Sequence, residues 1–171
     1  MIPCSDTGLD GDIRAGVTVP SPRFTDNANG TVTDNLSGLI WLKNANCFGT
    51  QSLANALQAA NALASVSCGL SDGSAEGDWR LPNVKELQSL IHFGFVGPAL
   101  SNAAGTAQWR EGDAFSAGGA FSNLQSNWYW SSTAWPGRPT AWFVSLYDGF
   151  TFDAGVTNNT HLHVWPVRGP E

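Results

Sequence analysis

One short stretch, Asp78 to Ile91, most constrains the fold of this chain, because an extended segment must turn directly into a helix there. Asn83 followed three residues later by Glu86 is the pattern of a capping box, in which two side chains satisfy open backbone donors at a helix start. Pro82 prevents the helix from beginning earlier and holds Leu81 extended. The stretch therefore predicts a strand-like segment that ends at Pro82 and is followed at once by a helix.

The side chains of this step also predict how it packs. Trp79 and Leu81 point to one side of an extended chain, so we expect both in the core and Arg80 on the opposite side. The helix, which we expect to run to about His92, carries an apolar stripe at helical spacing: Val84, Leu87, Leu90 and Ile91. A short amphipathic helix should therefore dock on the body of the protein.

The remaining elements are predicted from periodicity and turn residues. A first helix is expected over 51–64, capped by Thr50 or Ser52, with a stripe formed by Leu53, Leu57, Ala60, Leu63 and Ala64. Short strands are expected at 24–26, 31–33, 39–42, 128–132, 141–147 and 162–167, with turns at 27–30, 35–38, 135–139 and 148–149. Two helices followed by an antiparallel sheet predict an α+β fold.

The region 93–127 lacks a long periodic segment and is rich in Gly, Ala, Ser and Asn. Long structureless loops are uncommon in compact domains. Aromatic residues occur throughout it, and we expect them to hold an ordered but irregular backbone against the body: Phe93, Phe95, Trp109, Phe115 and Phe121. The region should therefore be a long irregular loop.

The chain length of 171 residues suits one domain with a substantial core, which we place at 22–171, preceded by an extended arm at 1–21. The formal charge of −6 argues against nucleic acid or an anionic membrane surface as a partner. No stretch is long and apolar enough to span a bilayer. The first residues lack the basic and apolar regions of a signal peptide. Most of the eight Trp are expected to fill the core.

Three cysteines, Cys4, Cys47 and Cys68, lie in the first half of the chain. We pair Cys47 with Cys68, because they bracket the first predicted helix, and a loop of that size would stabilise the fold by about 3 kcal/mol. Cys4 is then left as a free thiol or with a partner outside this chain. Inert thiols in a cytosolic protein are the alternative, but the pairing favours an oxidising compartment and a secreted or surface location.

Several motifs in order resemble the C-terminal domain family of the collagen-like bacterial adhesins, over about Pro22 to Gly169. Besides the Trp79 to Pro82 step, the motifs are Arg23 to Asn27, Gly30 to Leu36, Gly38 to Lys43, Trp130 to Thr133 and Val164 to Gly169. The resemblance implies a C-type-lectin-like fold related to formylglycine-generating enzyme, with two helices packed on short antiparallel strands and long irregular loops. It also implies an extracytoplasmic adhesin or recognition module.

The collagen-like adhesins bind sulfated polysaccharide, but the acidity of this chain disfavours a polyanionic ligand. Formylglycine-generating enzymes need a late cysteine pair for copper, and the second half of this chain contains no cysteine. Nucleophile, zinc-protease and phosphate-loop motifs are also missing. We therefore expect no catalysis and no cofactor.

A metal site is the main alternative. His161 and His163 are two residues apart on a predicted strand and would share a face, with Asp153 or Asp148 as a third ligand. A metalloprotein or enzyme working through these residues stays open, although exposed histidines without a metal are the simpler interpretation. A calcium loop at 26–34 is disfavoured, because the closing Glu is missing, and a hairpin turn is favoured there.

The candidate ligand-binding surface lies on the last strands and their loops, where aromatic and polar residues alternate. Rigid aromatics lose little entropy on ordering, so such mixtures form contact surfaces for protein or glycan ligands. The candidate binding residues are Trp135, Arg138, Trp142, Tyr147, Asp148, Phe150, Asn158, His161 and His163, with Phe152 and Asn159 nearby. A structural module that forms homo-oligomers and a diversified receptor-binding domain are further alternatives.

Overall fold

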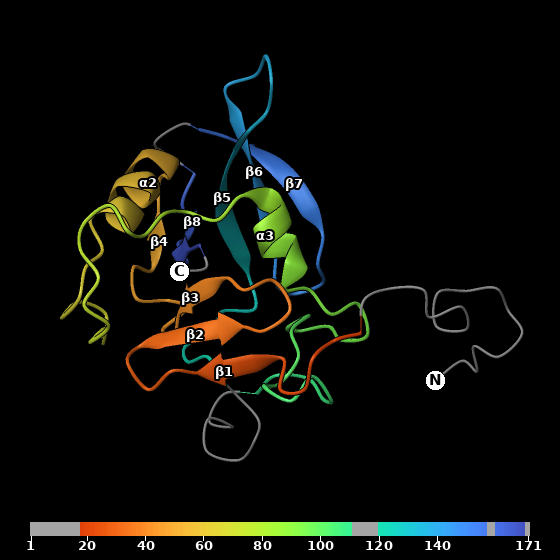
Figure 1. Cartoon of the computed structure of the whole chain (residues 1–171). Coiled ribbons are helices and arrows are strands. Elements are labelled where there is room, and N and C mark those ends of the chain that lie inside the picture. Colours follow the sequence, from red (N-terminus) through yellow and green to blue (C-terminus); the bar gives the residue numbers. More distant parts are fainter. Residues whose placement is uncertain (1–17, 111–119, 157–159, 170–171) are drawn as a thin grey trace, which may run out of the picture.

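The computed structural model describes residues 18–110, 120–156 and 160–169, which form two β-sheets and two short helices (Figure 1). One sheet has the strand order β1-β2-β3-β9 and the other the order β4-β8-β5-β6-β7. The strands are β1 (Phe24–Asp26), β2 (Thr31–Asp34), β3 (Ile40–Leu42), β4 (Thr50–Gln51), β5 (Trp128–Ala134), β6 (Thr140–Ser145), β7 (Thr151–Gly155), β8 (Leu162–His163) and β9 (Val167–Arg168). The predicted α+β class is confirmed. Residues 1–17 of the predicted arm lie outside the described residues.

The four-stranded sheet begins with the predicted hairpin of β1 and β2. Gly30 has a left-handed φ of 85°, and a Cβ atom there would lie 2.4 Å from the carbonyl oxygen of Gly69. Only glycine fits this close approach. The Asp26 carboxylate, one of the groups that a calcium loop would use, stabilises the turn. It accepts hydrogen bonds from the Lys43 side chain and from the backbone of Ala28. The hairpin interpretation of 26–34 is therefore supported.

The predicted single strand over 162–167 is wrong. The chain forms β8 in the five-stranded sheet and β9 in the four-stranded sheet, so these six residues connect the two sheets. Pro166, between them, has no N–H for a ladder, while its carbonyl accepts from Leu42. The buried Trp165 ring fixes the crossing, because its Nε1 donates to the carbonyl of Leu42.

Two strands were missed by the sequence prediction. β4 has only two residues, and β7 follows the Asp148–Gly149 turn with Asp, Ala and Gly among its five residues. Such residues have low β propensity, so β7 forms because it pairs along its whole length with β6. The other late strands begin as predicted or one residue earlier, and the turn over 135–139 is present.

Both predicted helices are present but shorter than expected: α2 (Leu53–Asn61) and α3 (Val84–Ser89). Ser52 caps α2, as one of the two predicted caps. Leu57, predicted on the buried stripe, is 44% exposed, whereas Ala56 and Ala60 are fully buried. The small alanines let the helix lie close to the sheet, so the inward face is shifted from the one that the leucines suggested.

The strand-to-helix step is confirmed. Trp79 and Leu81 are buried, and the capping box of Asn83 and Glu86 is complete. Arg80 lies on the outside and forms two hydrogen bonds of 2.7 and 2.8 Å with the carboxylate of Glu86, which raise its pKa. Burial raises the pKa of Glu86, but hydrogen bonds from Arg80 and the Asn83 backbone outweigh it and lower that pKa.

The helices pack on opposite faces of the five-stranded sheet. Tyr129 and Trp130 are neighbours on β5, so their side chains point to opposite faces. Tyr129 packs in the cluster that contains Leu87 of α3, and Trp130 packs in the cluster that contains Ala56 of α2. The sheet therefore separates two apolar clusters, and β5 contributes a large aromatic side chain to each.

The irregular region after α3 is only partly held by its aromatics. Trp109 and Phe121 are buried as predicted, whereas Phe93 is 83% exposed. The expectation for Phe93 is wrong because the ring lies over Gly149 at the surface. Phe115 lies outside the described residues.

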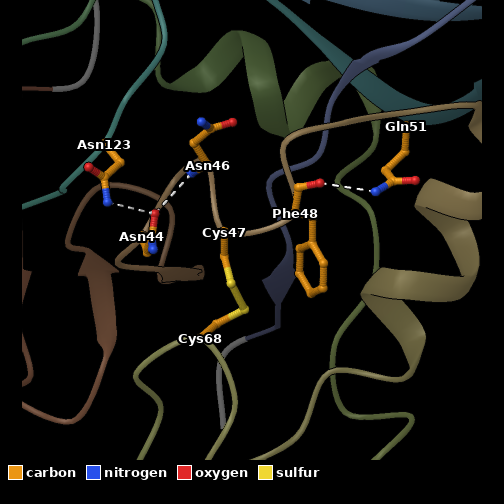
Figure 2. The surroundings of a disulfide bond; sticks show 7 residues. All are labelled: Asn44, Asn46, Cys47, Phe48, Gln51, Cys68 and Asn123. Atoms are coloured by element: carbon orange, nitrogen blue, oxygen red, sulfur yellow. Dashed lines mark hydrogen bonds between the residues drawn. A yellow bond between two sulfur atoms is a disulfide. The ribbon is translucent and has the colours of Figure 1, made fainter.

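The disulfide between Cys47 and Cys68 forms as predicted (Figure 2). It joins the segment before β4 to the loop after α2. Beside it, the side-chain oxygen of Asn44 accepts hydrogen bonds from the backbone of Asn46 and from the side chain of Asn123. Within the residues that the structure describes, no helix has the length and apolar character needed to cross a membrane.

Candidate functional site

Three exposed aromatic side chains lie together on the five-stranded sheet. Trp128, Phe150 and Phe152 expose 50%, 62% and 51% of their surface. The buried Phe143 lies between them, with its ring centroid 5.4 Å from that of Trp128 and 5.9 Å from that of Phe152. The rings of Phe150 and Phe152 are also 5.9 Å apart. We call these four residues the aromatic row.

The register of three strands places the row on one face. Phe143 lies opposite Trp130 on β5 and opposite Phe152 on β7, so these three side chains share a face. Trp128, two residues before Trp130, points to the same face. This is the face on which α2 packs, and the row continues beyond the part that α2 buries. An exposed apolar surface of this kind is a candidate interaction site.

The turn between β6 and β7 fixes the end of the row. The Ser145 N–H donates to the carbonyl of Phe150, and the Phe150 N–H donates to the Asp148 carboxylate. Gly149 has a φ of 83°, and a Cβ there would lie 2.7 Å from a methyl carbon of Ile91. The glycine is therefore required for this turn, and the turn sets the position of Phe150.

A second aromatic group lies at the tip of the β5–β6 hairpin. Trp135 and Trp142 stack with ring centroids 4.5 Å apart, and the Arg138 guanidinium lies 5.4 Å from the centroid of the Trp135 ring. We call these three residues the tip stack. Trp142 and Phe143 are consecutive on β6, so the tip stack and the aromatic row belong to opposite faces. Because Arg138 lies over Trp135, part of the indole surface is already used within the chain.

The structure divides the predicted ligand surface. Trp135, Arg138 and Trp142 form the tip stack, whereas Tyr147, Asp148 and Phe150 lie at the opposite end of β6. His161 and His163 lie at β8, which the strand order separates from β6 by β5. The expectation of one continuous patch is therefore wrong, because the alternation and direction of β6 send its residues to different faces and ends. Asn158 and Asn159 lie outside the described residues.

The geometry does not bring together the proposed metal ligands. His163 is half-buried, its Nδ1 lies 2.8 Å from the side-chain oxygen of Asn46, and its ring packs on Tyr129. Burial lowers the pKa of His163. His161 is exposed and precedes β8, while Asp153 lies on β7, at the far edge of the same sheet. Among the described residues no three His, Cys, Asp or Glu side chains gather as a metal site would require.

Sequence reasoning did not identify Trp128 as a surface residue, and it gave Phe152 only a secondary place. The Trp128-Tyr129-Trp130 segment shows alternation, which predicts a strand but not which of its aromatics is left uncovered. The length of α2 and its position on the sheet decide that. The uncovered aromatic side chains are therefore visible only once the strands are paired and the helix is docked.

The chain matches a known protein family over most of its length. Residues 30–168, most of the chain, match the model of the Lcl C-terminal domain. Neither the curated proteins nor the solved structures that were compared contain a match.

Proposed function

Because the chain belongs to the Lcl C-terminal domain family, we propose that it is an adhesin-like module that recognises a protein or glycan ligand through the aromatic row. The proposal includes a location outside the cytoplasm, in a secreted or surface protein, which the Cys47–Cys68 disulfide supports. A recognition role without catalysis and a C-type-lectin-like arrangement belong to the same proposal.

The exposed aromatic row is the observation that carries this function. Half or more of each of Trp128, Phe150 and Phe152 faces solvent. Complete burial of a large aromatic side chain removes roughly 150–250 Å² from water, so half or more of that area is still available on each ring. A ligand that covers the row would therefore gain substantial apolar contact. Aromatic residues at the centre of an interface dominate binding energies, and flat rings also suit the apolar faces of sugars.

Aromatic truncations on the two faces test this assignment. The probes are a glycan array and a displayed peptide library, followed by calorimetry on the selected ligand. We expect Trp128→Ala to weaken binding by more than about 1 kcal/mol, a loss that only a minority of interface residues cause when they are truncated. Trp135→Ala, which removes an indole of the tip stack on the opposite face, is the matched control and should bind as the unchanged protein does. Full binding by Trp128→Ala would refute the proposal, and loss only in Trp135→Ala would move the site to the tip stack.

A further inference from the structure

β7 differs from the other strands at the edges of the two sheets. In the four-stranded sheet, Phe24 of β1 donates to the carbonyl of Ala103, and Val167 of β9 exchanges two backbone hydrogen bonds with Arg80. In the five-stranded sheet, β4 has two residues, whereas β7 has five and forms the opposite edge (Figure 1). β7 is therefore the longest edge strand that the structure describes.

The hydrogen-bond pattern shows which backbone groups of β7 point away from β6. Ser145 donates to Phe150 and Val156 donates to Pro139, which fixes the bonded pairs at even positions of β7. Opposite residues alternate between bonded and non-bonded pairs, so Thr151, Asp153 and Gly155 direct their N–H and C=O groups outward. Within the described ranges, none of these outward backbone groups has a protein partner.

The side chains of β7 define what an added strand would have to match. On one face, Phe150 and Phe152 extend the aromatic row to the edge of the sheet. On the other face lies Asp153, opposite Trp142. β7 contains no Pro and no Lys, which are residues that protect edge strands from pairing. Its single charge is negative, as is the net charge of the chain.

We propose that β7 binds an extended segment of a partner protein by strand addition, a segment in which apolar residues alternate with basic ones. Backbone hydrogen bonds to Thr151, Asp153 and Gly155 would supply affinity, and alternate side chains would supply specificity. The apolar residues pack on Phe152 and its neighbours, and a basic residue lies beside Asp153. This inference rests on the proposed recognition function and commits it to a protein ligand.

A second copy of the chain fits this edge less well. When β7 pairs with its own copy about Asp153, two carboxylates lie opposite each other, and like charges directly opposite are unfavourable. A basic partner removes this repulsion. The charge of the edge therefore favours a different protein with complementary residues.

The test uses a capped seven-residue peptide of alternating phenylalanine and lysine, measured by calorimetry and by amide hydrogen exchange on the full chain. We expect binding to slow exchange at Thr151, Asp153 and Gly155 at least tenfold. The control peptide has the same sequence but is N-methylated at alternate residues, so it keeps charge and apolar surface but loses the donors for pairing. Equal binding of both peptides, or no binding, would overturn the proposal.

Two variants at one position separate backbone from side chain. Asp153→Pro removes the carboxylate and an outward N–H, whose loss an edge strand tolerates, whereas Asp153→Ala removes the carboxylate and keeps the N–H. We expect Asp153→Pro to bind at least tenfold more weakly than Asp153→Ala. If Asp153→Pro does not fold, the N-methylated peptide with the unchanged protein answers the same question.

If something other than a partner protein covers the outer edge of β7, these experiments give different results. Slow exchange at the three amides in the free monomer would mean that this chain covers its own edge, and a dimer lost in Asp153→Pro would assign the edge to a second copy. Both results would overturn the proposal. A ligand that is lost in Trp128→Ala but binds Asp153→Pro fully would retain the proposed function and refute strand addition. Binding at full affinity by both Trp128→Ala and Asp153→Pro would refute the proposed function and strand addition alike.

Discussion

Removal of the Cys47–Cys68 disulfide should lower the free energy of unfolding by about 3 kcal/mol, because the bridge closes a loop of 21 residues in the unfolded chain. Both cysteines are half-buried at the margin of the first apolar cluster, so a Cys47→Ala/Cys68→Ala variant leaves little cavity and measures mainly the lost cross-link. For a domain of this size the midpoint of thermal unfolding should fall by about 6–12 °C.

The backbone at Cys68 provides a matched comparison. Its φ of 53° lies in the left-handed region, which disfavours alanine relative to glycine by about 1 kcal/mol. The Cys47→Ala/Cys68→Gly variant should therefore lose about 1 kcal/mol less than the double alanine variant.

Urea denaturation, followed by tryptophan fluorescence under non-reducing conditions, measures both differences. A loss below 1 kcal/mol in the double alanine variant would show that the loop is already restricted in the unfolded chain. Equal stability of the two variants would refute the argument from the left-handed backbone.

Three further predictions concern stability. Gly30→Ala should lower the free energy of unfolding by more than about 2 kcal/mol, because its Cβ would clash with the Gly69 carbonyl. Gly73→Ala is the control, because Gly73 also has a left-handed φ but open space around it, and it should lose about 1 kcal/mol. Urea denaturation measures both losses, and equal losses would contradict the clash. Asn83→Ala should cost about 1 kcal/mol through the lost cap, and a neutral result would show that the capping box is not needed. Burial lowers the pKa of His163 below its unfolded value of 6.5, so His163 binds fewer protons in the folded state than in the unfolded state. The free energy of unfolding should therefore fall as the pH drops below about 6.5, and it should level off below the folded pKa. The His163→Gln variant should show a smaller dependence on pH in this range.

Local signals predicted the elements that are specified within a few residues. The capping box at Asn83 and the extended residues before Pro82 are found in the structure as the sequence indicated, because each depends on contacts between near neighbours. β7 was missed since its five residues have no strong preference for a strand. Its pairing with β6 supplies what local propensity lacks.

The candidate site shows the same division. The sequence identified the late strands as rich in aromatics, but it assigned their surface residues to one patch. Pairing between β5, β6 and β7 instead divides these residues between two faces, and docking of α2 leaves Trp128 exposed.

The sequence alone thus determined the class of fold, the disulfide and the strand-to-helix step, all of which follow from spacing and from the stereochemistry of single residues. Only the tertiary structure decided which aromatics are covered and which sheet edge lacks a backbone partner among the described residues. Burial depends on surfaces that distant segments provide, as at residues 162–167, where neighbouring residues join two different sheets. The residue order of a single strand does not specify which distant segments will pack against it.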